Sequence, residues 1–134
     1  MKILRDAVAI LVEKDGQYLF VQRPPGDLFE GYWSPPTGKV EPGESPAQAV
    51  VREAMEELSL TVTPVKKVWE SITSKRNFLL HWWTVRTLSY DIALNRDELS
   101  GYAWVYPSEI KSLGKIFESH LHFFENLDWY IANP

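Results

Sequence analysis

The chain has 134 residues, a net charge of −4 and no cysteine, and 45% of its residues are hydrophobic. This length suits one domain with a single core, and the apolar content argues against a disordered chain. The acidic balance gives no electrostatic footprint for duplex nucleic acid, and the absence of cysteine excludes disulfides and thiolate metal sites.

The N-terminal apolar run, residues 7–12, lies between Asp6 and Glu13. It is too short for a signal peptide or a membrane span, so we expect no membrane segment. A cytoplasmic protein is the expected default, and the lack of cysteine fits a reducing compartment.

The first third of the chain predicts a β-hairpin and then an irregular segment. Strands at 6–13 and 17–23 flank a turn at 14–16. Prolines and a glycine follow the second strand, so 24–31 is expected to be loop. A short strand is compatible with 32–33, just before two further prolines.

Residues 38–60 predict a loop that leads into a helix. Pro42-Gly43 does not fit regular structure, so the first seven residues are expected to form a tight loop. Ser45 is a suitable N-cap, Pro46 suits the first helical position, and Gln48 completes a capping box. The apolar residues that helical spacing turns toward the core are Ala47, Val50, Val51, Ala54 and Leu58.

The same helix carries an acidic face. Glu53, Glu56 and Glu57 lie at i, i+3 and i+4, where like charges each cost roughly 0.2–0.5 kcal/mol. Arg52 can offset Glu56, and a folded-back loop can bring Glu44 near this face. Two interpretations follow: a solvated helix face, or a site for a hard divalent cation such as Mg²⁺, which prefers oxygen ligands.

The remainder of the chain alternates between strands and short helices. The elements expected there are strands at 60–72, 78–87, 90–95 and 102–106 and helices at 107–113 and 117–131. Pro64 indicates that the first of these strands is an edge strand or is bent. Strands around one central helix, with another helix at the C-terminus, favour an α/β fold with a mixed sheet between helices.

The stretch 38–60 resembles the Nudix box, G-x5-E-x7-R-E-U-x-E-E-x-G-U, in which U is a bulky aliphatic residue. The fixed positions that match are Gly38, Glu44, Arg52, Glu53, Glu56 and Glu57. Ala54 is smaller than the usual aliphatic residue, and Ser59 replaces the glycine after the helix. We expect Ser59 to end the helix without a left-handed cap. A pattern of this length and fixed spacing is far more specific than a lone glycine motif.

The resemblance implies a Nudix-type α/β/α sandwich with a mixed β-sheet, in which residues 1–134 form a single Nudix domain. The flanks look MutT-like, with L-F-V-Q-R at 19–23 and G-Y-W-S-P-P-T-G-K-V-E-P-G-E at 31–44. Many relatives carry Pro-Gly-Gly where this chain has Pro36-Thr37-Gly38. Thr37 is therefore expected to alter how closely the loop backbone approaches a substrate.

Nudix enzymes that resemble this chain hydrolyse a nucleoside diphosphate linked to another group, using Mg²⁺ or Mn²⁺. The metal ligands that the resemblance implies are Glu53, Glu56 and Glu57, with Glu44 and the carbonyl of Gly38 as further candidates. Arg52 is expected to orient a glutamate instead of touching substrate. Metal ions at these carboxylates would neutralise the diphosphate and lower the pKa of bound water.

The proton acceptor for the attacking water is expected to be Glu53 or Glu98. Residues 97–104 are similar to a D-E-h-x-E-x-x-W segment that is common in the family, and Gly101 stands where a second glutamate is frequent. A positioned base is often worth about 10²–10⁴-fold in rate. The alternative for Glu98 is a solvated loop charge.

Two cations and several aromatic residues are candidates for substrate contacts. Arg23 and Lys39 suit phosphate, and the alternative for each is a surface cation paired with an acid. The aromatic residues that could stack on a base are Tyr32, Trp33, Trp82 and Trp83. The last two point to opposite faces of a strand, so at most one should reach a given pocket, and core packing is the alternative for each.

The MutT-like flanks favour a nucleoside triphosphate as substrate, cleaved to a monophosphate and pyrophosphate. Alternatives with the same chemistry are ADP-ribose, nucleotide sugars and dinucleoside polyphosphates. A different class is a nucleotide-binding module without turnover, which Thr37, Ser59 and Gly101 leave open. The complete set of glutamates favours the enzyme, because a binding module has no need of four carboxylates.

Overall fold

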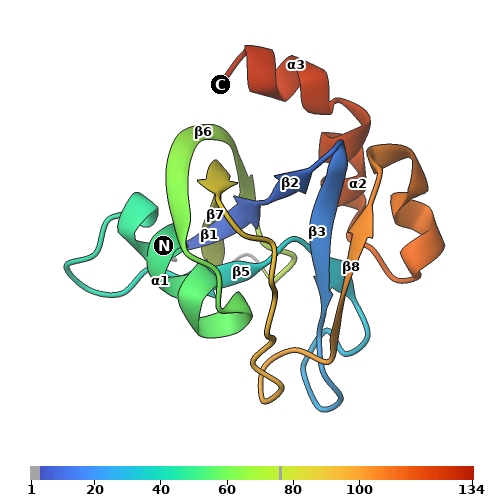
Figure 1. Ribbon diagram of the computed structural model, residues 1–134, viewed down its shortest axis with the longest axis horizontal. Coiled ribbons are helices and arrows are strands. Elements are labelled where there is room, and N and C mark those ends of the chain that lie inside the picture. The colour runs from blue at the N-terminus through green and yellow to red at the C-terminus, as the bar shows by residue number, and fades with distance from the viewer. Residues whose placement is uncertain (1–3, 76) are drawn as a thin grey trace.

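The computed structural model describes residues 4–75 and 77–134, which form strands flanked by helices (Figure 1). The strands are β1 (Arg5–Leu11), β2 (Glu13–Lys14), β3 (Gln17–Gln22), β4 (Trp33–Ser34), β5 (Thr37–Lys39), β6 (Val62–Ile72), β7 (Phe78–Thr87) and β8 (Gly101–Val105). The helices are α1 (Pro46–Leu58), the 3₁₀ helix η1 (Pro107–Leu113), α2 (Glu118–Glu125) and α3 (Leu127–Ala132). None of the helices in these described residues is both long and apolar enough to span a membrane.

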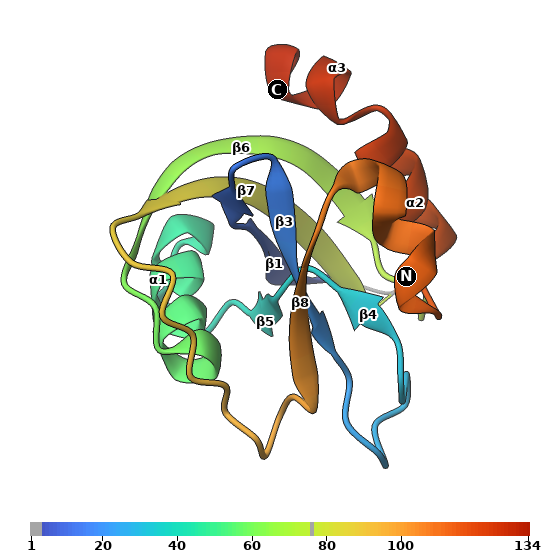
Figure 2. The same ribbon diagram turned by 45° about the vertical axis from the view of Figure 1, so that its right-hand side comes forward.

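The strands form two sheets. One sheet has the order β5-β1-β7-β6, in which β1 and β7 run parallel and the other pairs are antiparallel. In the other sheet β3 lies between β4 and β8 (Figure 2). The short strand β2 pairs with the first residues of β3. The expected α/β fold with a mixed sheet is therefore confirmed.

The expected N-terminal hairpin is confirmed only near its turn. β1 pairs with β5 and β7 in the first sheet, and the pairing across the turn is between β2 and β3. The chain changes sheets at Val12, whose carbonyl accepts a hydrogen bond from the N–H of Leu19 at 3.0 Å. Turn chemistry predicts a hairpin from local residues, whereas the partners of β1 come from distant parts of the chain.

Downstream segments also differ from expectation, while the bend at Pro64 is confirmed by a register shift in the edge strand β6. Residues 38 and 39, which were expected to be loop, belong to β5, because they pair with β1. Residues 90–95, all within the described part of the chain, form no strand. The last predicted helix is interrupted at Asn126, whose side-chain amide donates to the carbonyl four residues earlier and competes with the helical pattern.

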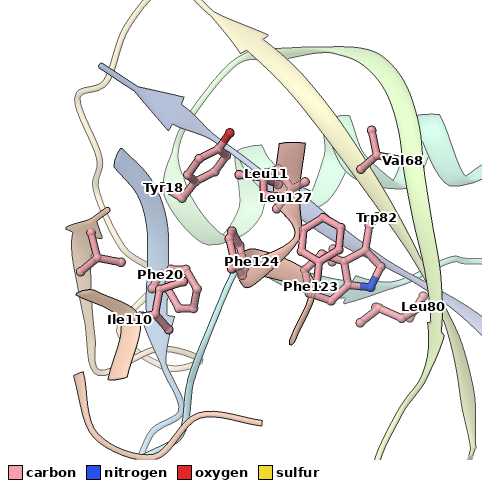
Figure 3. Packing of buried hydrophobic residues seen from close by; sticks show 13 residues of the cluster. Leu11, Tyr18, Phe20, Val68, Leu80, Trp82, Ile110, Phe123, Phe124 and Leu127 are labelled. Atoms are coloured by element: carbon pink, nitrogen blue, oxygen red, sulfur yellow. The ribbon is translucent and has the colours of Figure 1, made fainter. Parts of the chain in front are cut away.

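Alternating strand residues fill two hydrophobic clusters, one on each side of the β1–β7 pair. Trp82 packs with Phe123 of α2 in the first cluster (Figure 3). Ile10 packs with Leu58 of α1 in the second. Trp82 and its neighbour Trp83 lie in different clusters, which confirms that they point to opposite faces. The sheet that contains β1 and β7 therefore lies between α1 and the C-terminal helices.

The buried face of α1 is rotated relative to the expected one. Ala54 and Leu58 are fully buried as expected, but Val51 is 40% exposed. Glu53 and Glu57, at 9% and 5% exposure, lie on the buried side instead. The helix therefore turns two carboxylates toward the strands.

Candidate active site

Both ends of α1 are fixed, and this sets the direction of its acidic face. Ser45 Oγ accepts a hydrogen bond from Gln48 N–H at 3.1 Å, and Gln48 Oε1 accepts one from Ser45 N–H at 2.8 Å, which confirms the capping box. At the other end Ser59 has φ 59° and ψ 31°, in the left-handed region. The expectation that Ser59 avoids a left-handed cap is wrong, because its N–H turns back to the carbonyls of Ala54 and Met55.

β5 runs so close to α1 that Gly38 touches Glu53. A Cβ added at Gly38 would lie 2.1 Å from Cδ and 2.6 Å from Oε1 of Glu53, where no side chain fits. Gly38 has no positive φ, so the need for glycine is steric and not conformational. Its backbone is thereby brought against the carboxylate of Glu53.

The guanidinium group of Arg52 donates hydrogen bonds to three carboxylates, and a fourth, that of Glu41, lies 3.6 Å from its Nη1. Its Nε and Nη2 donate to the two oxygens of Glu44 at 2.8 and 2.9 Å. Its Nη1 donates to Glu53 at 2.9 Å and to Glu56 at 3.1 Å. The hydrogen bond from Arg52 lowers the pKa of Glu44, so this side chain stays charged. These contacts are what an arginine that orients glutamates should make.

Glu57 lies outside this arrangement and is the most buried carboxylate of α1. Its Oε2 is buried without a hydrogen-bond partner among the described residues. Burial is the main reason that the pKa of Glu57 is raised to about 8, and the charge of Glu53 adds to it. The charge of Arg23 opposes this shift. Such a carboxylate requires a proton or a cation at its free oxygen.

Glu98 is brought to the same cluster by a loop that is tied to α1. The N–H of Asn95 donates to the carbonyl of Glu57 at 2.9 Å, and the N–H of Glu98 donates to the carbonyl of Asn95 at 3.1 Å. The charge of Glu98 raises the pKa of both Glu53 and Glu57, although its own side chain is exposed. The two residues predicted as alternative bases therefore share one electrostatic environment.

Arg23 follows β3 and lies close enough to influence both the acidic cluster and α2. Its Nη2 donates to Oγ1 of Thr37 at 2.8 Å. Its charge opposes the raised pKa of Glu57, and it adds to the burial that lowers the pKa of His120 to about 4. Within the described residues Arg23 forms no salt bridge, so the alternative of a cation paired with a surface acid is not observed.

Lys39 takes part in the cluster through its backbone. Its carbonyl accepts a hydrogen bond from Arg52 Nη2 at 2.8 Å. Its ammonium lies 5.5 Å from the ring centroid of Phe78, over which Arg5 also lies at 5.2 Å. The phosphate contact expected of Lys39 stays a prediction, and it would require the ammonium to leave the Phe78 ring.

Trp82 does not fit the substrate contact expected of it. Its ring is fully buried, with ring centroids 5.1 Å from Trp69 and 4.8 Å from Phe123, and its Nε1 donates to Ser71 Oγ at 2.9 Å. The expectation is wrong because no face of the ring is open to a ligand, and core packing holds instead (Figure 3). Trp33 of β4 is only partly buried and remains a candidate.

A cavity of about 530 Å³ opens beside Tyr32 and Phe117, whose ring centroids are 4.6 Å apart. Thr73, Ser74 and Ser119 supply hydroxyl groups to its wall. The carbonyl of Tyr32 accepts a hydrogen bond from the N–H of Arg23 at 2.9 Å, so one residue of the cavity wall is tied to the backbone of Arg23. Its hydroxyl residues come from the β6–β7 connection and the start of α2, and no sequence spacing could have grouped them.

The carboxylate oxygens of the acidic cluster are suitable ligands for a hard divalent cation, but they do not converge on one point. Among the described residues no three acidic or histidine side chains converge into a metal site. One oxygen of Glu53 and one of Glu56 accept hydrogen bonds from Arg52. Further oxygen ligands are available from Oε2 of Glu57, which has no hydrogen-bond partner among the described residues, and from the backbone of Gly38 beside the cluster. The residues present therefore fit a hard divalent cation chemically.

Comparison with known proteins points to one family. Residues 3–127 match the sequence model of the NUDIX domain. A CTP pyrophosphohydrolase of Escherichia coli (strain K12) is 37% identical over 111 residues, which cover 81% of this chain and 80% of that protein. The nucleoside triphosphatase NudI of Salmonella agona (strain SL483) is 31% identical over 120 residues, covering 79% of this chain and 84% of that protein. The crystal structure of a MutT protein from Methanosarcina mazei Go1 has a TM-score of 0.82 and 25% identity, covering 96% of this chain and 95% of that chain.

Proposed function

The chain belongs to the Nudix family, and from this premise we propose that it is a divalent-metal-dependent pyrophosphohydrolase. Its substrate is a nucleoside diphosphate linked to another group, most simply a nucleoside triphosphate that is cleaved to a monophosphate and pyrophosphate. The observation that carries the proposal is Glu57, whose Oε2 is buried in an acidic cluster without a hydrogen-bond partner among the described residues. The charge of Arg23 acts on this carboxylate and opposes the rise of its pKa.

Nudix hydrolases generally use a divalent metal ion, and we propose Mg²⁺, with Mn²⁺ as a substitute. The groups that would hold it are Glu53, Glu56 and Glu57, with Glu44 and the carbonyl of Gly38 in support. When bound, the metal neutralises the diphosphate and lowers the pKa of water. Without a cation, four carboxylates would repel a polyphosphate.

The side chains of the site are proposed to have three further roles: orienting the carboxylates, binding a phosphate and accepting a proton. Arg52 keeps the carboxylates in place through its fork of hydrogen bonds. Arg23 presents a guanidinium to a phosphate, for which its paired donors are well shaped. The proton of the attacking water passes to Glu53, which is held by a 2.9 Å hydrogen bond from Arg52, or to Glu98, which is exposed and free to turn.

The nucleoside is proposed to lie in the cavity beside Tyr32 and Phe117. Two aromatic rings and several hydroxyl groups suit a base and a sugar. The names of two relatives, a CTP pyrophosphohydrolase and a nucleoside triphosphatase, support a triphosphate as substrate. Because free nucleotides are cytoplasmic, we place the reaction in the cytoplasm.

The test is a hydrolysis screen with Mg²⁺, with Mn²⁺ and with a chelator. It covers common and oxidised nucleoside triphosphates, ADP-ribose, nucleotide sugars and dinucleoside polyphosphates, and every product is identified. Chelator-sensitive release of pyrophosphate from a triphosphate supports the proposal. Monophosphate release from a sugar or dinucleotide substrate keeps the chemistry but replaces the substrate class. Tight nucleotide binding without any turnover would overturn the enzyme and favour a binding module.

A further inference from the structure

A side-chain hydrogen bond links the segment that follows β3 in one sheet to β5 in the other, at the proposed phosphate side of the site. Arg23 follows β3 in one sheet, and Thr37 is the first residue of β5 in the other. Nη2 of Arg23 donates to Oγ1 of Thr37 at 2.8 Å. Among the described residues this is the one hydrogen bond that the Arg23 side chain makes with protein.

The guanidinium of Arg23 is therefore oriented by Thr37 and neutralised by no acid in the described part of the chain. Its charge still reaches the carboxylate of Glu57 and the imidazole of His120. A guanidinium has five N–H donors in a fixed plane, so holding one of them sets the direction of the others. The remaining donors are free to contact an anion.

The backbone of Thr37 is itself firmly placed. It pairs with Ala9 of β1, and the next residue, Gly38, packs directly against Glu53. Threonine is stiff about its first side-chain torsion because Cβ is branched. The hydroxyl of Thr37 therefore stands at a defined point relative to the acidic cluster. A glycine at this position could not make the bond.

We propose that Thr37 is a positioning residue that presets Arg23 for the phosphate of the substrate. The inference rests on the proposed function, and it extends that function by naming the residue that directs the phosphate-binding arginine. Thr37 would thus contribute to substrate binding through its hydroxyl group, in addition to any effect on how closely the loop backbone approaches the substrate.

The experiment is a double-variant cycle on Arg23 and Thr37. Thr37→Val keeps the shape and removes the hydroxyl, whereas Thr37→Ser keeps the hydroxyl. Each is combined with Arg23→Ala, and Thr63→Val on β6 serves as the matched control because Thr63 is exposed. The readouts are kcat and KM for the best nucleotide, equilibrium affinity for a non-hydrolysable triphosphate analogue, and thermal unfolding.

Thr37→Val is expected to weaken analogue affinity and raise KM by about 3- to 10-fold, the range for one lost hydrogen bond. Thr37→Ser and Thr63→Val are expected to stay within about twofold of wild type, since neither loses that bond. In the Arg23→Ala background, Thr37→Val should have no further effect, because its partner is already absent.

An unchanged affinity in Thr37→Val would overturn the inference, and so would a loss that persists undiminished in the Arg23→Ala background. A loss shared by Thr37→Ser together with lowered thermal stability would assign Thr37 a structural role and likewise overturn it. If wild type hydrolyses nothing, the proposed function fails, while the affinity cycle still decides whether Thr37 directs Arg23. The two failures are thereby distinguishable.

Discussion

Gly38→Ala is the sharpest test of how β5 and α1 fit together. The added methyl carbon would lie 2.1, 2.3 and 2.6 Å from Cδ, Cγ and Oε1 of Glu53. Glu53 cannot simply swing away, because it is 9% exposed and is held by Arg52 at 2.9 Å. Either the carboxylate must leave Arg52 or β5 must move. Overpacking of this kind typically costs about 1–3 kcal/mol.

The free energy of unfolding of Gly38→Ala, measured by urea titration, should therefore fall by about 1–3 kcal/mol. Gly101→Ala is the matched control, because its Cβ would meet only ordinary contacts at 3.8 Å. That variant should stay within about 0.5 kcal/mol of wild type. In a Glu53→Ala background the clash is absent, so adding Gly38→Ala should cost little or stabilise slightly.

Two outcomes would refute this reasoning. If Gly38→Ala were as stable as wild type, β5 would not lie against Glu53 as described. If its cost remained in the Glu53→Ala background, the strain would come from the backbone of β5 and not from the carboxylate. A normal hydrolytic activity would not change either conclusion, because the prediction concerns the packing of β5 against Glu53.

Three further variants test other parts of the site. Burial lowers the pKa of His120 from 6.5 to about 4, so protonation of this imidazole favours the unfolded state. The free energy of unfolding should therefore fall as the pH drops from 6.5 to about 4, and it should fall less in His120→Leu. Arg52→Lys should lower kcat at least about tenfold with the fold intact, because an ammonium cannot reproduce the fork to Glu44; an unchanged kcat would contradict this. Trp82→Ala should cost about 3–5 kcal/mol, seen in urea titration, whereas a stacking residue would raise KM at unchanged stability.

Features that depend on near neighbours in sequence could be predicted. The capping box of Ser45 and Gln48 places α1, and helical spacing then brings Glu53 and Glu57 onto one side. Which side is buried could not be predicted, because Val51 and Glu57 border the same apolar stripe on opposite flanks. Packing of the strands against α1 selects the flank with the carboxylates. The left-handed conformation of Ser59 was also missed, since serine gives no signal for it.

Features that depend on residues distant in the chain could not be predicted from the sequence. β1 leaves the predicted hairpin because its neighbours are β5 and β7. Arg23 and Thr37 stand 14 positions apart and meet only after the chain has crossed from one sheet to the other. Trp82 and Trp33 looked equivalent as aromatic residues, and only the arrangement of α2 against the sheet separates core from surface.

The central claim is that the acidic face of α1 performs metal-dependent pyrophosphohydrolysis, and Glu57→Gln tests it most directly. Pyrophosphate release from the best triphosphate substrate is measured with saturating Mg²⁺ for wild type and for this variant, with thermal unfolding as the check on folding. Wild type should be active only with the metal, and the variant should lose at least about 10²-fold while remaining folded. A Glu57→Gln variant that turned over at the wild-type rate would contradict the claim.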